Sequence, residues 1–147
     1  MNPNFKTIIF QFLKKLVLIS ILLFVFTFIE IYWAMGSFSE KLSSGNPDSL
    51  FFDDAYLLSV FATILLTIAF LLFTLIKNNY LKTALELISL ILIWFFWNYN
   101  IFVDRESAWS TYLFKEEIVY TLTLSFFPIL ILSIATVFGL NYLLKKI

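Results

Sequence analysis

The chain has 147 residues, of which 61% are hydrophobic, 20% aromatic and 14% charged. Folded soluble proteins carry about a quarter of charged residues, so this composition excludes an ordinary soluble domain and indicates a membrane protein. Ten basic and ten acidic side chains cancel to a net charge of zero, which gives no indication of a nucleic-acid partner.

The residue types that are absent restrict the chemistry. The chain contains no His and no Cys, which excludes disulfides, thiolate nucleophiles and His/Cys zinc sites. Its three glycines, Gly36, Gly45 and Gly139, form neither a GxGxxG nor a GxxxxGK[ST] motif, so nucleotide binding is not expected. Only carboxylates, hydroxyls and amines remain for chemistry. We therefore expect no metal and no cofactor, and we assign no enzymatic activity.

Four apolar stretches are long enough to cross a membrane, because about 20 helical residues span about 30 Å of hydrocarbon. Polar, turn-prone clusters separate them. Lipid requires such segments to pair their backbone groups internally, which a helix achieves. We therefore predict an all-α, polytopic membrane protein, a bundle of four transmembrane helices that forms a single domain over residues 1–147. The predicted spans are residues 16–35, 55–76, 83–102 and 117–144, and the predicted outer connections are residues 36–54 and 103–116.

Lys and Arg are concentrated on one side of this predicted topology. Because basic residues favour the cytoplasmic side, we predict that both termini are cytoplasmic. Nine Lys against one Arg, with abundant Phe, Ile and Asn, is typical of AT-rich bacterial genomes, so we expect a bacterial cytoplasmic (inner) membrane. The inner side has Lys6, Lys14, Lys15, Lys77, Lys82, Lys145 and Lys146, whereas the outer side has Lys41, Arg105 and Lys115.

Two acids fall within the predicted spans, and an acid in lipid is by default a functional hypothesis. Glu86 stands three residues after Thr83 at the predicted start of the third span, a spacing that favours a capping box. Glu30 lies in the last third of the first span, where the helix dipole disfavours an anion, so it needs a partner. Either Glu30 is bound by neighbouring side chains and serves only to fix the register of the helices, or it has a functional role. The candidate intramembrane polar site comprises Glu30, Trp94, Trp97, Asn98, Asn100 and Arg105.

The Trp and Tyr residues concentrate in the outer half of the predicted bundle. An interfacial aromatic belt accounts for this distribution without a ligand. The alternative is an aromatic, acid-rimmed cavity around Glu30 that attracts an organic cation or a lipid amine. The outer acidic rim comprises Asp53, Asp54, Asp104 and Glu106.

Small side chains recur every four residues in the second span and share one helix face. Such stripes let helices approach closely in lipid, and a hydrated polar path is the other interpretation. The predicted helix-packing stripe is Ala55, Ser59, Thr63 and Thr67.

In size, in its four predicted spans and in its Asp104-Arg105 pair at the outer end of the third span, the chain resembles lipoprotein signal peptidases. The resemblance concerns layout and implies a hydrolase with two facing carboxylates. The residues depart from that family's pattern, because Asn100 stands four residues before Asp104 instead of three and no glycine is nearby. Glu117 or Asp54 would have to supply the second acid. We make no claim of family membership, and an intramembrane carboxylate-dependent hydrolase stays the remote alternative.

The four-span plan with one acid in the first span also resembles small multidrug transporters. Glu30 departs from that pattern by lying close to the outer edge. The Lys bias also fixes one orientation, where those proteins often show little bias.

A short chain with neither a nucleotide site nor a catalytic motif fits a non-enzymatic integral membrane component. We expect an accessory, assembly or protective subunit whose acidic outer rim and small-residue stripe contact another membrane protein. The alternative is a homo-oligomeric carrier or channel for a small or organic cation, with Glu30 as the coupling or selectivity carboxylate. The expected partners are the lipid bilayer and another membrane protein or a second copy of the chain, with no nucleic acid and no nucleotide.

Overall fold

The computed structural model describes residues 3–146, apart from the side chains of residues 3–6, 8 and 146. Over this range the chain forms four α-helices and two single-turn 3-10 helices, with no β-strand, so the predicted all-α fold is confirmed. The α-helices are α1 (Pro3–Met35), α2 (Phe51–Phe73), α3 (Asn79–Arg105) and α4 (Phe114–Lys146). The 3-10 helices η1 (Gly36–Phe38) and η2 (Ser107–Trp109) follow α1 and α3.

Each of the four α-helices in the described range is long and apolar enough to cross a membrane. Large apolar side chains are exposed along all four, for example Val17, Phe61, Leu92 and Phe138. Lipid accommodates such a surface, whereas a soluble protein rarely exposes apolar patches of this size. The four helices therefore suggest an integral multi-pass membrane protein.

The bounds of α2 differ from the predicted span because local signals act at both helix ends. The helix begins at Phe51, four residues early, and its first turn contains Asp53 and Asp54, whose charges suit the positive end of the helix dipole. It ends before Thr74, whose hydroxyl donates a hydrogen bond to the carbonyl of Leu71 (2.6 Å). A prediction from hydropathy alone extends the span past this turn to residue 76, because residues 75 and 76 are apolar.

The start of α3 also differs from the prediction. The side-chain oxygen of Asn78 accepts hydrogen bonds from the N–H groups of Tyr80 and Leu81 (3.0 and 3.3 Å), so Asn78 caps the helix. The predicted capping box of Thr83 and Glu86 is wrong, because both residues lie within the helix. Glu86 is instead a buried side chain, 4% exposed.

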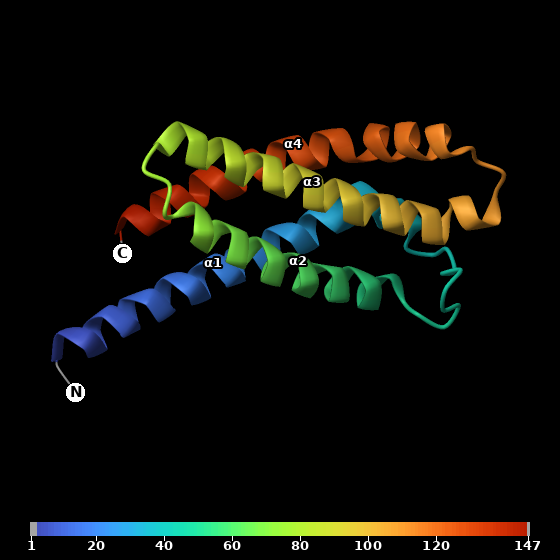
Figure 1. Cartoon of the computed structure of the whole chain (residues 1–147). Helices are drawn as coiled ribbons and strands as arrows, with labels where there is room; N and C mark the ends of the chain where they lie inside the picture. The colour runs from blue at the N-terminus through green and yellow to red at the C-terminus, as the bar shows by residue number, and fades with distance from the viewer. Residues whose placement is uncertain (1–2, 147) are drawn as a thin grey trace.

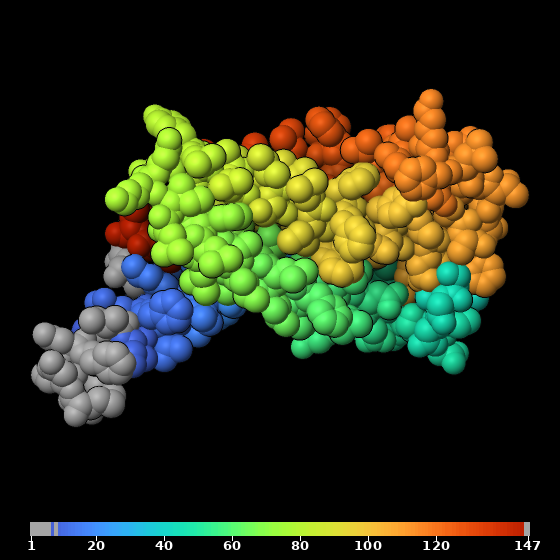
Figure 2. Space-filling model, viewed as in Figure 1, coloured from blue at the N-terminus to red at the C-terminus, as the bar shows by residue number. Residues whose placement is uncertain are grey.

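The four helices run alternately in opposite directions, so the start of α1, the end of α4 and the α2–α3 connection lie at one end of the bundle (Figure 1). The α1–α2 and α3–α4 connections lie at the other end. α1 packs against α2 and α4, and α3 packs against α4 and α2. Figure 2 shows the side chains of α2 and α3 forming a continuous surface, whereas the first part of α1 projects beyond the other helices in Figure 1. We call the first end the basic end, for Lys14, Lys15, Lys77, Lys82 and Lys145, and the second the acidic end, for the acids of the α1–α2 and α3–α4 connections.

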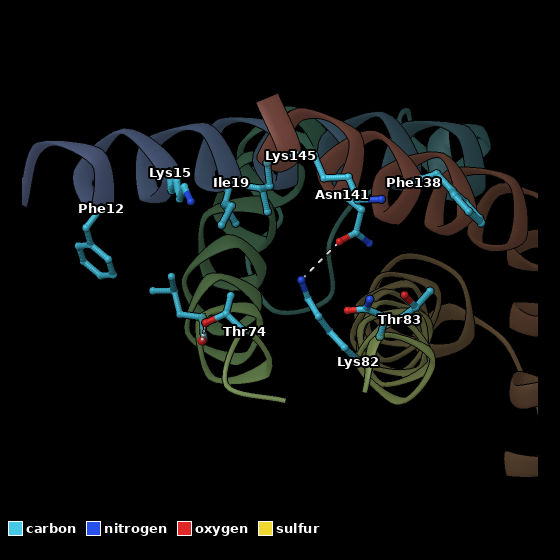
Figure 3. Close-up of a pocket in the computed structure, with 12 residues that line it drawn as sticks. Phe12, Lys15, Ile19, Thr74, Lys82, Thr83, Phe138, Asn141 and Lys145 are labelled. Carbon is cyan, nitrogen blue, oxygen red and sulfur yellow. Dashed lines mark hydrogen bonds between the residues drawn. The ribbon is translucent and has the colours of Figure 1, made fainter. Parts of the chain in front are cut away.

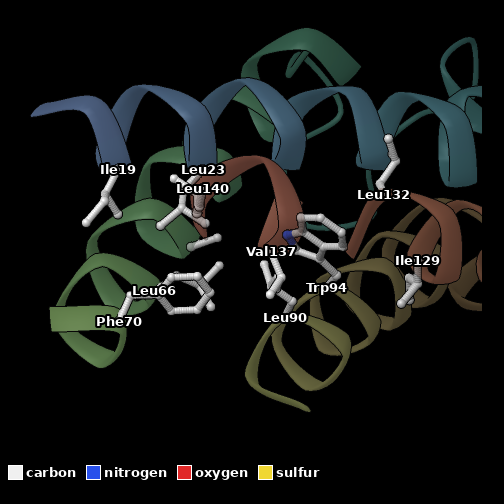
Figure 4. Packing of buried hydrophobic residues seen from close by; sticks show 11 residues of the cluster. Ile19, Leu23, Leu66, Phe70, Leu90, Trp94, Ile129, Leu132, Val137 and Leu140 are labelled. Carbon is white, nitrogen blue, oxygen red and sulfur yellow. The ribbon is translucent and has the colours of Figure 1, made fainter. Parts of the chain in front are cut away.

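The interior consists of two apolar clusters separated by polar side chains. The larger cluster, toward the basic end, includes Leu23, Leu66 and Trp94 (Figure 4). The smaller cluster, toward the acidic end, includes Ile31 and Ile101. Between them every helix contributes a polar residue that is 0% exposed, and we call this set the polar layer: Thr27, Glu30, Ser59, Asn98, Thr121 and Ser125.

The small-residue stripe of α2 faces the interior of the bundle. Ala55 and Ser59 are fully buried, and Thr67 is 7% exposed, with its hydroxyl 3.3 Å from the hydroxyl of Ser20 on α1. The Thr63 hydroxyl is enclosed as well. Packing within the chain therefore occupies the stripe, and a partner protein would have to contact another surface.

Replacement of Ala55 by Leu is expected to destabilise the fold by about 1–3 kcal/mol, because the added side chain has no space between the helices. The free energy of unfolding in mixed micelles measures this. The matched control is Ala135→Leu, at an exposed position of α4, which should change that free energy by less than about 0.5 kcal/mol. Equal effects of the two substitutions would contradict the interior placement of the stripe.

Candidate functional site

The Glu30 carboxylate lies in the polar layer and is bound by Asn98. The Asn98 amide nitrogen donates hydrogen bonds to Glu30 Oε1 (2.7 Å) and to the hydroxyl of Ser125 (3.1 Å). All three residues are 0% exposed. One amide of α3 thus connects an acid of α1 with a hydroxyl of α4.

A second hydrogen bond lies one helical turn away. The indole N–H of Trp94 donates to the Thr27 hydroxyl (2.9 Å). Thr27 precedes Glu30 by three residues, and Trp94 precedes Asn98 by four, so each pair shares one helix face. Two donors about one turn apart on α3 therefore meet two acceptors about one turn apart on α1, and we call this arrangement the α1–α3 ladder. Sliding either helix by one turn would break both bonds.

Several atoms of the polar layer retain unused hydrogen-bonding capacity. Glu30 Oε2, Asn98 Oδ1 and the Thr121 hydroxyl are enclosed and have no partner among the described residues. Asn98 Oδ1 is an acceptor only, the hydroxyl both donates and accepts, and Glu30 Oε2 accepts when the carboxyl is ionised and donates when it is protonated. The layer therefore combines a carboxylate with further oxygens on neighbouring helices.

Three of the predicted site residues, Trp97, Asn100 and Arg105, form no hydrogen bond with Glu30. Trp97 packs against the larger apolar cluster, and its enclosed indole N–H has no partner in the described part of the chain. Asn100 is exposed and donates to the carbonyl of Phe96 in its own helix (2.7 Å). Arg105 binds groups at the acidic end. Of the six predicted residues, only Glu30 and Asn98 are bonded to each other.

Arg105 joins three segments at the acidic end, although it is only 1% exposed. Its guanidinium forms an ion pair with Asp54 of α2. It also donates to the carbonyls of Lys41 and Ser49 in the α1–α2 connection. A planar guanidinium suits this role, because its donors point in several fixed directions.

Asp104 holds the same connection from the other side. Its Oδ1 accepts hydrogen bonds from the Ser44 N–H (3.0 Å), the Ser44 hydroxyl (2.8 Å) and the Gly45 N–H (3.0 Å). Nearby, the Trp109 indole donates to the carbonyl of Leu42 (3.0 Å). Lys41 and Glu106 form a further ion pair between the two outer connections. We call these joined segments, residues 36–50 and 104–113, the outer platform, after the predicted outer connections to which they belong.

The carboxylates considered for hydrolysis have separate partners. Asp54 binds Arg105, and Asp104 binds the Ser44 region. Glu117 accepts hydrogen bonds from the Tyr99 hydroxyl (2.8 Å) and from the Ser107 hydroxyl. Each of the three acids stabilises a junction between segments. Of the outer acidic rim, Asp53 alone is exposed, and the other three side chains are half-buried.

Sequence reasoning missed Thr27, Thr121 and Ser125. A signal was present for α4, because Thr121 and Ser125 are four residues apart and Ser133 follows eight residues later on the same helix face, and all three are 0% exposed. For Thr27, the spacing of three from Glu30 was the available signal. No protein family, curated protein or solved structure matches the chain, so the site is interpreted from its own geometry.

Replacement of Asn98 by Ala should lower the free energy of unfolding by about 1–3 kcal/mol, since it leaves the buried Glu30 carboxylate without its donor. Asn100→Ala is the matched control, and because that side chain is exposed it should change stability by less than about 0.5 kcal/mol. Denaturation of the two variants in mixed micelles compares them directly. A stable Asn98→Ala variant would show that the α1–α3 ladder does not support the fold.

Proposed function

We propose that the chain is a non-enzymatic, multi-pass component of a bacterial cytoplasmic membrane, an accessory, assembly or protective subunit that contacts another membrane protein. The observation that carries this proposal is the outer platform. Hydrogen bonds and ion pairs within the chain hold the platform in place, and its surface nevertheless exposes large apolar side chains. Exposed apolar side chains on an ordered surface are typical of contact surfaces. Those at the platform and the adjoining start of α4 are Leu42, Leu50, Trp109, Leu113 and Phe114, each at least 59% exposed.

The charges around this surface support a basic partner. Glu40, Asp48 and Asp53 are exposed and form no ion pair within the described range. Of the three cations at the same end, Lys41 and Arg105 are bound to acids of the chain itself, and Lys115 alone is left against these three exposed acids. The unpaired acids therefore leave a negative field at the acidic end, which favours a partner with complementary charge.

The distribution of charge also supports the proposed orientation. The basic end contains the start of α1 and the end of α4, and the positive-inside rule favours a cytoplasmic location for that end. The outer platform then lies on the opposite side of the membrane, where it would meet the extracytoplasmic part of a partner.

Purification of the tagged chain from native membranes in mild detergent should yield a particle that contains a second membrane protein in fixed stoichiometry. The Leu50→Ser, Leu113→Ser double variant should reduce its recovery by about tenfold, because the central apolar residues of an interface dominate its affinity. Mass measurement and peptide identification of the particle provide the readout.

The matched control is Leu75→Ser with Leu81→Ser, which removes two exposed leucines at the basic end. It should leave recovery unchanged. A particle that contains only this chain, or equal loss in both double variants, would contradict a partner on the outer platform.

A cation carrier is the second candidate function, and the polar layer favours it specifically. Glu30 is a carboxylate inside the bundle, and Glu30 Oε2 and Asn98 Oδ1 are acceptors with no donor among the described residues. A proton or a small monovalent cation would complement these oxygens. An acid so placed in a membrane protein is a common element of ion pathways.

If the chain carries cations, Glu30→Gln should reduce flux into liposomes by at least about tenfold, while Asn98 retains an acceptor and the fold is preserved. Potassium, sodium and proton fluxes of the Glu30→Gln variant are compared with those of Glu40→Gln, which makes the same substitution at an exposed acid. Normal flux in the Glu30 variant would exclude the carrier function. Absence of flux in the wild-type chain would do the same.

A further inference from the structure

The basic end contains a cavity of about 590 Å3, within the range of small-ligand sites. Figure 3 shows it between α1 and α4 on one side and the neighbouring ends of α2 and α3 on the other. Three different helices each contribute one lysine, namely Lys15 from α1, Lys82 from α3 and Lys145 from α4. Cations that converge from separate helices on one cavity are a feature of anion-binding sites.

The charges at this cavity are not balanced within the chain. Lys82 Nζ lies 3.6 Å from Glu86 Oε1 and donates to Asn141 Oδ1 (3.4 Å). Asn141 in turn donates to Glu86 Oε2 (3.1 Å), so this side of the cavity is preorganised. Lys15 and Lys145 have no hydrogen bond or ion pair with any described residue. Three cations therefore face one buried acid.

The remaining walls are largely apolar. Phe12 and Ile19 of α1 line the cavity, together with Leu71 of α2. Such walls would stay uncovered by a hydrophilic phosphate compound, whereas the glycerol backbone and the first methylenes of a lipid would cover them. The position at the end of long apolar helices also corresponds to the depth of lipid headgroups.

We propose that this cavity binds the phosphate group of an anionic phospholipid, held by Lys15, Lys82 and Lys145, with the start of its acyl chains against the apolar wall. Basic pockets between transmembrane helices at the cytoplasmic surface are suited to such headgroups. The phosphate oxygens accept charge-assisted hydrogen bonds from the ammonium groups. The proposal rests on the membrane location of the chain but not on a partner at the outer platform, since it concerns the opposite end of the bundle.

The test is titration of the delipidated full-length protein in a neutral detergent with dioleoyl phosphatidylglycerol, followed by native mass spectrometry. Dioleoyl phosphatidylcholine and glycerol 3-phosphate are titrated in parallel. We expect phosphatidylglycerol to bind at least fivefold more tightly than phosphatidylcholine. Each lysine near an anionic headgroup contributes about fivefold in affinity, so Lys15→Gln with Lys145→Gln should weaken binding by about 25-fold.

The matched control is Lys14→Gln with Lys77→Gln, which removes the same charge from the same end without changing a residue that lines the cavity. It should weaken binding by less than about threefold. Lys82 is left intact in both variants because it neutralises the buried Glu86.

Equal weakening in the two double variants would overturn the proposal, because attraction to the whole basic end would then account for binding. Equal affinity for phosphatidylcholine would also overturn it. Tight binding of glycerol 3-phosphate that depends on Lys15 and Lys145 would retain the phosphate site but reject a lipid as its source. Competition between glycerol 3-phosphate and phosphatidylglycerol shows whether the two compounds occupy the same site.

Discussion

The α1–α3 ladder determines how the rest of the bundle is assembled. Lipid tails are as apolar as leucine side chains, so apolar burial does not by itself set the relative height of two helices in a membrane. Polar pairs do, because a donor or acceptor left unpaired in the interior costs about 1–3 kcal/mol. The bond from Trp94 to Thr27 and the bond from Asn98 to Glu30 are satisfied in the same register. A shift by one turn would break both bonds and bring only one of the two α3 donors level with an acceptor of α1, so two buried polar groups would lose their partners.

Both ends of the bundle depend on that register. Asn98 and Asp104 lie on the same helix, so fixing the height of α3 also sets where Asp104 and Arg105 meet the α1–α2 connection. Ser125 extends the link to α4. Toward the other end, the heights of α3 and α4 bring Lys82 and Glu86 level with Asn141. The outer platform and the lysine-lined cavity are thus consequences of one arrangement in the centre of the bundle.

The sequence was sufficient to predict four long apolar helices, because the length and hydropathy of each segment are enough to identify such a helix. It also indicated that Glu30 needs a partner, and Asn98 was among the candidates. It did not predict that Arg105 binds Asp54, because that choice depends on the path of residues 36–50. It placed the start of α3 at Thr83 because hydropathy rises there, whereas the cap at Asn78 is a local hydrogen-bonding effect.

Glu30 contributes more chemistry than the ladder requires. The Asn98 amide needs one acceptor oxygen at that position, and a neutral amide side chain of the same length would supply it. A carboxylate adds a second acceptor, Glu30 Oε2, for which the described residues provide no donor. Burial of an acid in lipid is costly, and a side chain with only a structural role would gain nothing from that cost. The excess of acceptors at Glu30 and Asn98 is therefore the feature that favours cation binding as a second proposed function beside the proposed subunit role.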